Sequence, residues 1–397
     1  MPLQGCYRNL RVLDVSENIA GPLATMILAD LGADVIKLER ADGGDSTRRL
    51  PPRRGDTSTV FATVNRNKRS VALDLSTLEG RTGAMKIAST CDVVVESFRP
   101  GVAEKLGLGF DDVSAVRSDV VYCSISAFGR GALGRERPGY DALVQAFTGI
   151  LSLTGSPEGP PARTAPSAVD ISTGMWAAMS IMAVMADHPA GSGPVRLDAT
   201  LIDSALFLMC HQIVGLLGAG YSPPRLGSAA PSAAPYQEFA TSDGSIMVAA
   251  ATDALFEKLC AAIDADYLRR DDRFRTVAQR VALREELAAE LQAIFIARPS
   301  RHWLTAIAAA GVPVSPVHSL EAAVCDPLTL ERELITTVSG DGESMPQLRL
   351  PLDQDRQLPM RPPPELGQHT DEVLCQVGFT PERARALATA RASQAAR

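Results

Sequence analysis

The chain has few of the residues that mark metal or disulfide chemistry. Its seven cysteines and five histidines are scattered along 397 residues, and no CxxC pair occurs. An odd, dispersed set of cysteines is typical of reduced thiols and argues against a disulfide framework. No spacing of these residues predicts a metal site. We therefore expect a cytoplasmic protein with reduced thiols and no bound metal.

An excess of positive charge and long apolar runs are also missing. The net charge is −7, so no overall attraction to nucleic acid is expected. Apolar runs such as 175–186 and 205–210 are too short to cross a bilayer. Residues 1–9 are polar and lack the apolar core of a signal peptide. The sequence predicts neither a nucleic-acid nor a membrane partner.

A repeated alternation of strand and helix patterns is present instead. A strand pattern at 10–15 precedes a helical pattern at 23–31, and a second strand pattern follows at 33–38. The alternation continues through 70–75, 79–89, 92–96, 102–106 and 120–125. Such βαβ units predict an α/β fold with a parallel sheet in a Rossmann-like, doubly wound large domain. No GxGxxG follows the first strand, which argues against a nicotinamide dehydrogenase.

Two proline-rich segments divide the rest of the chain. Helical patterns at 174–185 and 200–217 are followed by a segment, 218–235, with four prolines and three glycines. A hairpin about Asp243-Gly244 then opens a smaller region of two strands and three helices. A second proline-rich segment lies at 350–364, and two helical patterns end the chain. We predict a large domain at 1–217, a linker at 218–235, a small α+β domain at 236–327, and a linker with a C-terminal segment at 328–397.

One carboxylate occupies an unusual setting. Asp170 lies between Val169 and Ile171, just before a helical pattern. A carboxylate among apolar and small residues can be kept dry and oriented, as a nucleophile requires. The same position is also ordinary for a helix N-cap. Free N–H groups at a helix start favour the ionised form, which is the nucleophilic one, so local sequence leaves capping and catalysis both open.

An ordered series of motifs extends over nearly the whole chain. It comprises Val12-Leu13-Asp14, Ala20-Gly21-Pro22, residues 28–39, Gly44-Asp45, Asn67-Lys68-Arg69-Ser70, Phe98-Arg99-Pro100-Gly101, residues 125–129, Arg137-Pro138-Gly139-Tyr140-Asp141, Asp170 with Thr173-Gly174, and residues 369–374. No single motif is specific, but the series in this order is. It resembles the family III CoA-transferases, the group that includes formyl-CoA:oxalate and carnitine CoA-transferases.

The resemblance implies an architecture and a reaction. The fold would be a Rossmann-type large domain, a small domain and a C-terminal segment that returns to the large one. Two chains would interlock as a homodimer, with the active site between the large and small domains. The partners would be an acyl-CoA and a small carboxylic acid, with coenzyme A as part of the substrate. Asp170 matches the family's catalytic aspartate, whose carboxylate attacks the thioester to give a mixed anhydride and then an aspartyl-CoA thioester.

The resemblance also implies a set of contacts to coenzyme A. They fall on Ile19, Ala20, Arg40, Leu73, Ser97, Phe98, Arg99, Lys105 and the stretch 138–141, which includes Tyr140. Arg40 and Lys105 carry charge that suits the CoA phosphates, and the Phe98 ring suits adenine. By local sequence alone, a solvated surface position is the more typical setting for the two cations, and a core position for the ring.

Some positions depart from the family pattern. Glu17 and Ile19 stand where some members have His and Gln, Ser97 where many have Asn, and Pro138 where one has Lys. The segment 226–232 also lacks the glycine run of the formyl-CoA enzyme. The resemblance therefore implies no specificity for oxalate or formate.

Tyr140 separates two reactions within the family. The related α-methylacyl-CoA racemases use a histidine at this place as a proton-transfer base. Histidine titrates near neutral pH, whereas a tyrosine hydroxyl keeps its proton there and is a poor base. This favours CoA transfer, with a racemase-like isomerase and a non-catalytic CoA-binding protein as the alternatives.

Overall fold

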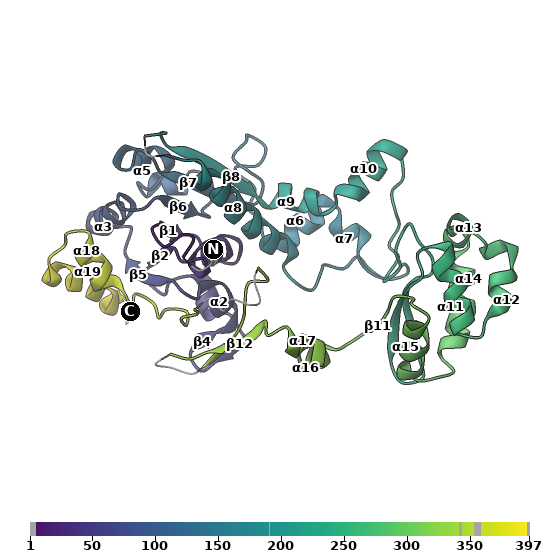
Figure 1. Cartoon of the computed structure of the whole chain (residues 1–397). Coiled ribbons are helices and arrows are strands. Elements are labelled where there is room, and N and C mark those ends of the chain that lie inside the picture. Colours follow the sequence, from purple (N-terminus) through teal and green to yellow (C-terminus); the bar gives the residue numbers. More distant parts are fainter. Residues whose placement is uncertain (1–4, 190, 341–343, 353–358, 395–397) are drawn as a thin grey trace. The chain divides into compact units, whose positions relative to one another are not determined.

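The computed structural model describes residues 5–189, 191–340, 344–352 and 359–394 (Figure 1). The chain forms two compact units. The first is Met1–Thr148, Ala165–Cys210 and Leu330–Arg397, and the second is Gly149–Thr164 and His211–Thr329. Each has its own buried apolar core. Residues 353–358 of the second proline-rich segment and the last residue of the final helical pattern, Ala395, lie outside the described residues.

The first unit is built on a sheet of six parallel strands. Their bounds are β1 (Arg11–Val15), β2 (Asp34–Arg40), β5 (Arg69–Leu73), β6 (Val93–Glu96), β7 (Val121–Ser126) and β8 (Val195–Thr200). They lie in the order β5-β2-β1-β6-β7-β8 with parallel pairing throughout. This is the strand order of a doubly wound sheet, so the predicted α/β class and parallel sheet are confirmed. Strand β8, whose Arg196 and Asp198 interrupt its apolar pattern, was not predicted.

Helices cover both faces of this sheet. On one face, α1 (Ala20–Asp30) and α8 (Ala168–Ala186) pack against each other. On the other face lie α3 (Leu78–Ala88), α5 (Phe110–Val116) and α18 (Thr370–Gln376), which is followed by α19 (Pro381–Gln394). We refer to these as the α1 face and the α3 face. The end of the chain therefore packs against the sheet.

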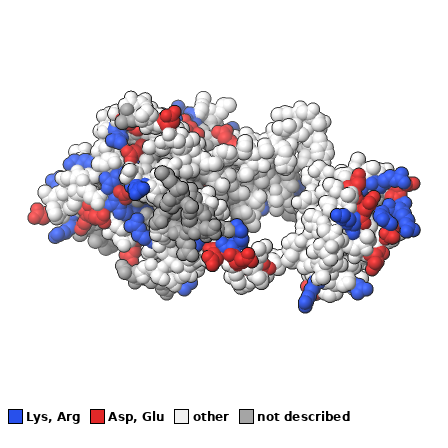
Figure 2. Space-filling model, viewed as in Figure 1, with Lys and Arg blue, Asp and Glu red and all other residues white. Residues whose placement is uncertain are grey.

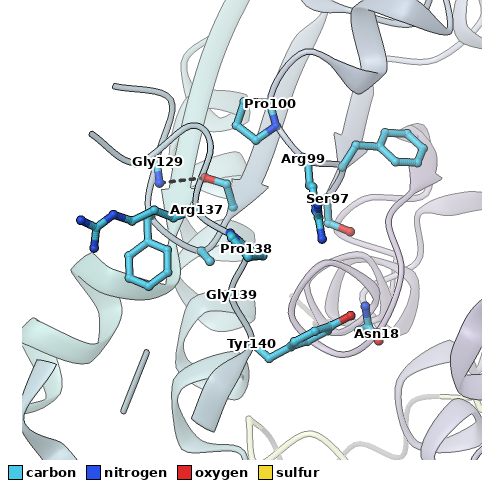
Figure 3. Close-up of a pocket in the computed structure, with 14 residues that line it drawn as sticks. Asn18, Ser97, Arg99, Pro100, Gly129, Arg137, Pro138, Gly139 and Tyr140 are labelled. Atoms are coloured by element: carbon cyan, nitrogen blue, oxygen red, sulfur yellow. Dashed lines mark hydrogen bonds between the residues drawn. The ribbon is translucent and has the colours of Figure 1, made fainter. Parts of the chain in front are cut away.

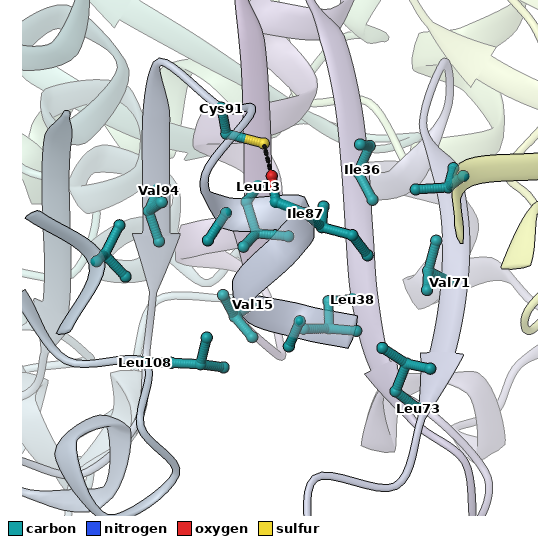
Figure 4. Close-up of a cluster of buried hydrophobic side chains, with 14 of the residues drawn as sticks. Leu13, Val15, Ile36, Leu38, Val71, Leu73, Ile87, Cys91, Val94 and Leu108 are labelled. Atoms are coloured by element: carbon teal, nitrogen blue, oxygen red, sulfur yellow. Dashed lines mark hydrogen bonds between the residues drawn. The ribbon is translucent and has the colours of Figure 1, made fainter. Parts of the chain in front are cut away.

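The α3 face is filled by apolar side chains (Figure 4). Strand residues such as Leu13, Ile36 and Val71 meet Ile87 of α3, and all of them are fully buried. Cys91 belongs to the same cluster, and its Sγ donates a hydrogen bond to the Ile87 carbonyl at 3.3 Å. Alternate residues of a strand point to opposite faces, which is why every second residue of β1 and β2 reaches this cluster.

Further short elements complete the first unit. They are η1 (Ser46–Arg49), β3 (Arg53–Arg54), β4 (Thr57–Ser58), α2 (Thr59–Asn65), α4 (Val102–Lys105), α6 (Asp141–Thr148), α9 (Leu201–Leu208), β12 (Ile335–Val338) and β13 (Met345–Leu348). β12 pairs with β13, and β3 with β4, both antiparallel. Buried Arg66, which follows α2, forms an ion pair with Asp30 and also donates to Gln347 of β13. This late segment is thereby tied to the first helix.

The second unit has a three-stranded antiparallel sheet and a helical layer. β9 (Tyr236–Ala240) and β10 (Ser245–Ala249) form the predicted hairpin, and β11 (Val314–Pro316) pairs with β10. The helices are α7 (Ile150–Leu153), α10 (Cys210–Ala219), α11 (Asp253–Ala262), α12 (Asp266–Arg270), η2 (Asp272–Phe274), α13 (Val277–Ala282), α14 (Arg284–Phe295), α15 (Ser300–Ala309), α16 (Leu320–Cys325) and, at the boundary, α17 (Pro327–Glu331). Its core is apolar and includes Phe239, Leu291 and Trp303.

The unit boundaries differ from the domain limits expected at 217 and 327. Residues 149–164 and 211–217 belong to the second unit, as do residues 328–329. The helical pattern at 200–217 is in fact two helices, α9 and α10, that separate at Met209. Local periodicity continues across that break, so only packing reveals where one unit ends.

Helix α8 starts earlier than the pattern at 174–185 indicates. Its 19 residues are long and apolar enough to cross a membrane, by length and composition alone. The same is true of α9 and α10 taken together, which are bent by 68° relative to each other. The expectation that this run is too short to cross a bilayer is therefore wrong for α8 on length. The helix packs against α1, which is also how the core helix of a doubly wound sheet lies.

Candidate active site

Two turns meet where the strand order of the sheet reverses. The 16–19 turn follows β1 and the 97–101 turn follows β6, and β1 and β6 are neighbours. In doubly wound sheets, ligands bind beside the carboxyl ends of the strands at this switch point. Of the residues predicted from sequence, Ile19, Ser97, Phe98 and Arg99 lie in these two turns.

Buried charged side chains fix the start of the 16–19 turn through hydrogen bonds to its main chain. The Asp14 carboxylate accepts the Ser16 N–H at 3.0 Å and forms an ion pair with Lys68 at 2.8 Å. Lys37 donates from Nζ to the Ser16 carbonyl at 2.8 Å and pairs with Asp45 at 3.0 Å. Both atoms of the Ser16 peptide that can form hydrogen bonds are thus fixed by side chains, where a dinucleotide-binding fold would have a glycine-rich turn.

The charges in this group stabilise one another. Burial alone would raise the Asp14 pKa, but the ammonium groups of Lys68 and Lys37 outweigh it and hold that pKa well below its usual range. Burial lowers the pKa of Lys68 to about 8, against the opposing effect of Asp14. Buried charges persist in a fold only when they are paired and hydrogen-bonded. Asp14, Lys37 and Lys68 meet both conditions.

A cavity of about 150 Å³ lies between the two turns and the segment that carries Tyr140. We call it the Tyr140 cavity. Its lining residues are Asn18, Ser97, Phe98, Arg99, Pro100, Ser126, Ala127, Phe128, Gly129, Gly134, Arg137, Pro138, Gly139 and Tyr140. Figure 3 shows Arg99, Ser97, Tyr140 and Asn18 turned toward a common space, and the guanidinium of Arg137 directed away from it. Polar groups on three segments therefore converge here.

A second cavity, of about 380 Å³, also has Phe98 in its lining. We call it the Leu73 cavity. It is lined by Arg40, Ala41, Asp42, Leu73, Asp74, Leu75, Ser76, Phe98 and Leu106. Arg40, which is about half exposed, forms long ion pairs with Glu17 at 3.7 Å and Asp42 at 3.8 Å. An apolar floor with a loosely held cation at the rim suits a planar ring that carries phosphate.

The structure brings together some of the predicted contact residues but not all. Ser97, Phe98, Arg99 and Tyr140 line the Tyr140 cavity, and Arg40, Leu73 and Phe98 line the Leu73 cavity. The remaining three line neither cavity: Ile19 is the N-cap of α1, Ala20 is the buried first residue of that helix, and Lys105 is exposed at the end of α4.

Asp170 lies in the first turn of α8, and another carboxylate caps that helix. The helix begins at Ala168, with Ser167 in the N-cap position and no hydrogen bond from the serine side chain. The Asp141 carboxylate accepts the N–H groups of Val169 at 2.9 Å and Asp170 at 3.1 Å. The interpretation of Asp170 as the N-cap is therefore wrong, since Asp141 of α6 performs that role.

The environment of Asp170 favours its protonated form more than the sequence suggested. Burial, and then the negative charge of Asp141, raise the Asp170 pKa to about 7. The expected stabilisation by free helix N–H groups is reduced because Asp141 already occupies two of them. At neutral pH the two forms of Asp170 are comparably populated. A half-buried carboxylate of this kind is poorly solvated and hence reactive when ionised.

The sequence profile of CoA-transferase family III matches residues 7–370. The chain belongs to CoA-transferase family III. Succinyl-CoA:glutarate CoA-transferase of Homo sapiens is 34% identical over 381 residues, covering 95% of this chain and 86% of that protein. Acetyl-CoA:oxalate CoA-transferase of Acetobacter aceti is 34% identical over 345 residues, covering 86% and 88% respectively.

A solved structure gives the same result. The crystal structure of a CAIB/BAIF family protein from Brucella suis superposes with a TM-score of 0.83 at 33% identity, covering 95% of this chain and 99% of that one. The relatives are named as CoA-transferases, so this chain is a transferase that acts on an acyl-CoA. The resemblance found in the motifs is confirmed.

Two glycines of the family III motifs stand where any side chain would clash with neighbouring atoms. A Cβ on Gly174 would lie 2.6 Å from the Ala20 carbonyl oxygen, and one on Gly21 would lie 2.3 Å from Ser16 Cβ. Neither residue tolerates a side chain, because α8, α1 and the 16–19 turn meet there. Asp170 precedes Gly174 by four residues and so projects from the same side of α8.

Sequence reasoning missed two residues of this site. Asn18 lines the Tyr140 cavity and has a φ of 69°, a left-handed conformation for which asparagine is enriched; this was the available signal. Asp141 was noted only as a CoA-contact position. Its role depends on a contact with α8 across 28 residues, for which the sequence holds no signal.

Proposed function

We propose that this family III CoA-transferase moves CoA from an acyl-CoA donor to a free carboxylic acid, with Asp170 as the covalent nucleophile. The observation that carries the proposal is the setting of Asp170. The carboxylate is half-buried, its backbone N–H is fixed by Asp141, and its pKa is raised to about 7. Binding of CoA alone requires no such group.

The reaction divides into exchanges at two carbonyl carbons. The ionised Asp170 attacks the thioester carbonyl and the C–S bond breaks. CoA leaves as a thiolate, and a mixed anhydride between the acyl group and Asp170 remains. The thiolate then attacks the aspartyl carbonyl, releasing the donor acid and leaving an aspartyl-CoA thioester. The acceptor carboxylate repeats these steps in reverse order, forming a new anhydride and then a new acyl-CoA. Each step replaces one leaving group by one nucleophile, so no proton or electron is consumed.

The two cavities provide a route for coenzyme A. We assign the adenine to the Leu73 cavity, between Leu73 and Phe98, with Arg40 at its rim. Lys105 would meet a phosphate from the end of α4, and Ile19 and Ala20 would guide the pantetheine arm toward Asp170. The Tyr140 cavity would hold the reacting end, where Arg99 offers a cation to a carboxylate.

The acceptor is proposed to be a dicarboxylic acid. The two relatives described above are named for glutarate and oxalate, and the first is also named for succinyl-CoA. In each case a second carboxylate remains free while the first reacts. Arg99 in the Tyr140 cavity suits that second charge.

We also propose that two copies of the chain associate. Apolar side chains are exposed along α8 and α9, with Met175 at 49% and Phe207 at 58%. The surface over α6 and α9 is largely uncharged in Figure 2. Exposed apolar area of this kind marks interaction surfaces. Mass measurement in native buffer should give about twice the 42.1 kDa chain mass, whereas an active monomer would rule out the interlocked homodimer.

An exchange assay tests the reaction. Succinyl-CoA is incubated with a panel of mono- and dicarboxylic acids, and new acyl-CoA esters are identified by mass spectrometry. We expect dicarboxylic acceptors to react fastest. Hydroxylamine added during turnover should convert Asp170 to a hydroxamate, visible in the tryptic peptide.

The racemase-like reaction is tested separately. A 2-methylacyl-CoA incubated in heavy water should keep its α-hydrogen, because Tyr140 replaces the histidine base. Deuterium uptake at a catalytic rate, without any exchange of CoA, would contradict the proposed function.

A further inference from the structure

Glu96 is a buried carboxyl group that the chemistry above does not use. It ends β6, and only 6% of the residue is exposed. Its Oε2 accepts the backbone N–H of Phe98 at 2.8 Å. This bond spans two residues and fixes the first step of the 97–101 turn as it leaves the sheet. A carboxylate that accepts a backbone N–H makes one of the stronger hydrogen bonds in a protein.

The neighbouring strand fixes the orientation of Glu96. Ser124 of β7 is its register partner, and the Ser124 hydroxyl bonds to the Glu96 carboxyl group. Arg130 donates from Nη1 to that same hydroxyl at 3.3 Å and from Nη2 to Glu104 at 3.0 Å. A guanidinium can only donate, so the serine must direct its own hydrogen toward Glu96. The same carboxyl group accepts the Phe98 amide through Oε2.

This arrangement acts on a residue that lines both cavities. Phe98 lines both the Tyr140 cavity and the Leu73 cavity, and its ring also packs against the apolar cluster of the α3 face. A displacement of its main chain would therefore change the shape of both cavities together. Burial raises the pKa of Glu96 to about 7, so its ionised form is held there at a cost in stability.

We propose that Glu96 is a positioning residue for coenzyme A, which anchors the Phe98 main chain so that this residue keeps its place in the lining of both cavities. The inference rests on the proposed function, since it takes these cavities as the CoA site. Glu96 touches no reacting atom in this scheme. Its effect is on affinity for CoA and not on the rate of the bound complex.

The test is calorimetric titration of free coenzyme A into the full-length protein, with kcat of succinyl-CoA exchange measured in parallel. Glu96→Gln keeps an acceptor oxygen at the same reach, so its Kd should stay within about threefold of wild type. Glu96→Ala removes the acceptor, and its Kd should rise about tenfold while kcat changes less than about threefold. The Glu96→Asp side chain is one methylene too short to reach the Phe98 N–H, so its Kd should rise as in Glu96→Ala. This variant tests the inference if the alanine variant does not fold.

Glu104→Gln is the matched control. Glu104 lies beside the same cluster and pairs with Arg130, but no backbone N–H of the 97–101 turn bonds to it among the hydrogen bonds of the described residues. Its Kd for CoA should stay near wild type. An unchanged Kd in Glu96→Ala, equal losses in Glu96→Gln and Glu96→Ala, or a loss confined to kcat would overturn the inference. A wild-type protein that binds no CoA would instead overturn the proposed function itself.

Discussion

The two faces of the central sheet bury different proportions of apolar and charged side chains in β1 and β2, although the same strands supply both. In β1, Leu13 and Val15 join the apolar cluster of the α3 face, and Asp14 between them bonds to Thr25 of α1 on the other. In β2, Lys37 alternates in the same way with Ile36 and Leu38. Both faces bury apolar side chains, Val12 and Val35 among those on the α1 face, but the α1 face also buries ion pairs toward the carboxyl ends of the strands.

The difference shows what buried ion pairs add to a sheet whose two faces are both stabilised by apolar burial. Apolar burial gains roughly 25 cal/mol per Å² whatever its orientation, whereas buried ions gain little and must be paired to be tolerated. Ion pairs are directional, however, and can hold a turn in one conformation. Asp14 and Lys37 fix the 16–19 turn in this way. Both faces contribute apolar burial to the stability of the sheet, and the buried ion pairs of the α1 face also fix the 16–19 turn of the site.

The largest expected effect is on chemistry at the α1 face. Asp170→Asn keeps the size of the side chain but removes the proposed nucleophile, so CoA exchange should fall by about a thousandfold or more. The variant should still fold and bind CoA. Asp203→Asn is the control, since Asp203 also lies in the first turn of a helix on this side. Near wild-type exchange by Asp170→Asn, with deamidation excluded by mass, would refute covalent catalysis by Asp170.

A matched pair of core variants compares the two faces directly. Lys68→Met leaves Asp14 charged and short of its closest ammonium partner, and should cost about 3–5 kcal/mol of unfolding free energy. Leu13→Ala on the α3 face should cost a similar 2–5 kcal/mol by creating a cavity. Urea denaturation measures both. Only Lys68→Met should also weaken CoA binding; equal CoA affinity in the two variants would contradict the division between faces.

The pH dependence of turnover should report Asp170. Its pKa of about 7 means that the nucleophilic form is lost as pH falls. At saturating acyl-CoA, kcat should drop about tenfold per pH unit below that value and level off above it. The profile is measured from pH 5 to 9. A kcat that stays flat down to pH 5 would mean that the carboxylate is ionised throughout.

The same group should make stability depend on pH. The folded pKa of Asp170 lies above the value of about 3.9 in an unfolded chain, so the folded state binds the proton more tightly. Wild-type stability is therefore lost as pH rises from about 4 to 7. Asp170→Asn avoids this loss and should be more stable than wild type at pH 8, by on the order of 1 kcal/mol, with no difference near pH 4. Thermal unfolding at both pH values checks the sign.

The smallest effect is expected at the exposed ion pairs of the second unit. Arg273 pairs with Asp271 and Glu286 in the second unit, whose visible surface carries both acidic and basic side chains (Figure 2). Solvent screens such pairs, and they rarely contribute measurably. Arg273→Ala should leave the denaturation midpoint unchanged. A clear shift would show that ion pairs stabilise this protein wherever they lie, and not only at the α1 face.

The sequence by itself determined the fold class, the family and the residue expected to react. Alternating strand and helix patterns predict the parallel sheet because periodicity is a local property. The series of motifs was sufficient for the family, and Asp170 followed from its place in that series. The sequence also predicted Phe98, Arg99 and Tyr140 as residues of one CoA site, and all three line the Tyr140 cavity; their contact with CoA stays a prediction.

Only the tertiary structure decided which groups act on one another. Asp141 caps α8 from 28 residues away, Lys68 reaches Asp14 across 54 residues, and Glu96 takes its orientation from Ser124 in the adjacent strand. Such contacts depend on strand order and helix packing, which no local pattern encodes. The same holds for the Asp170 pKa, because burial and a neighbouring charge set it, and both arise only when α6 and α8 come together.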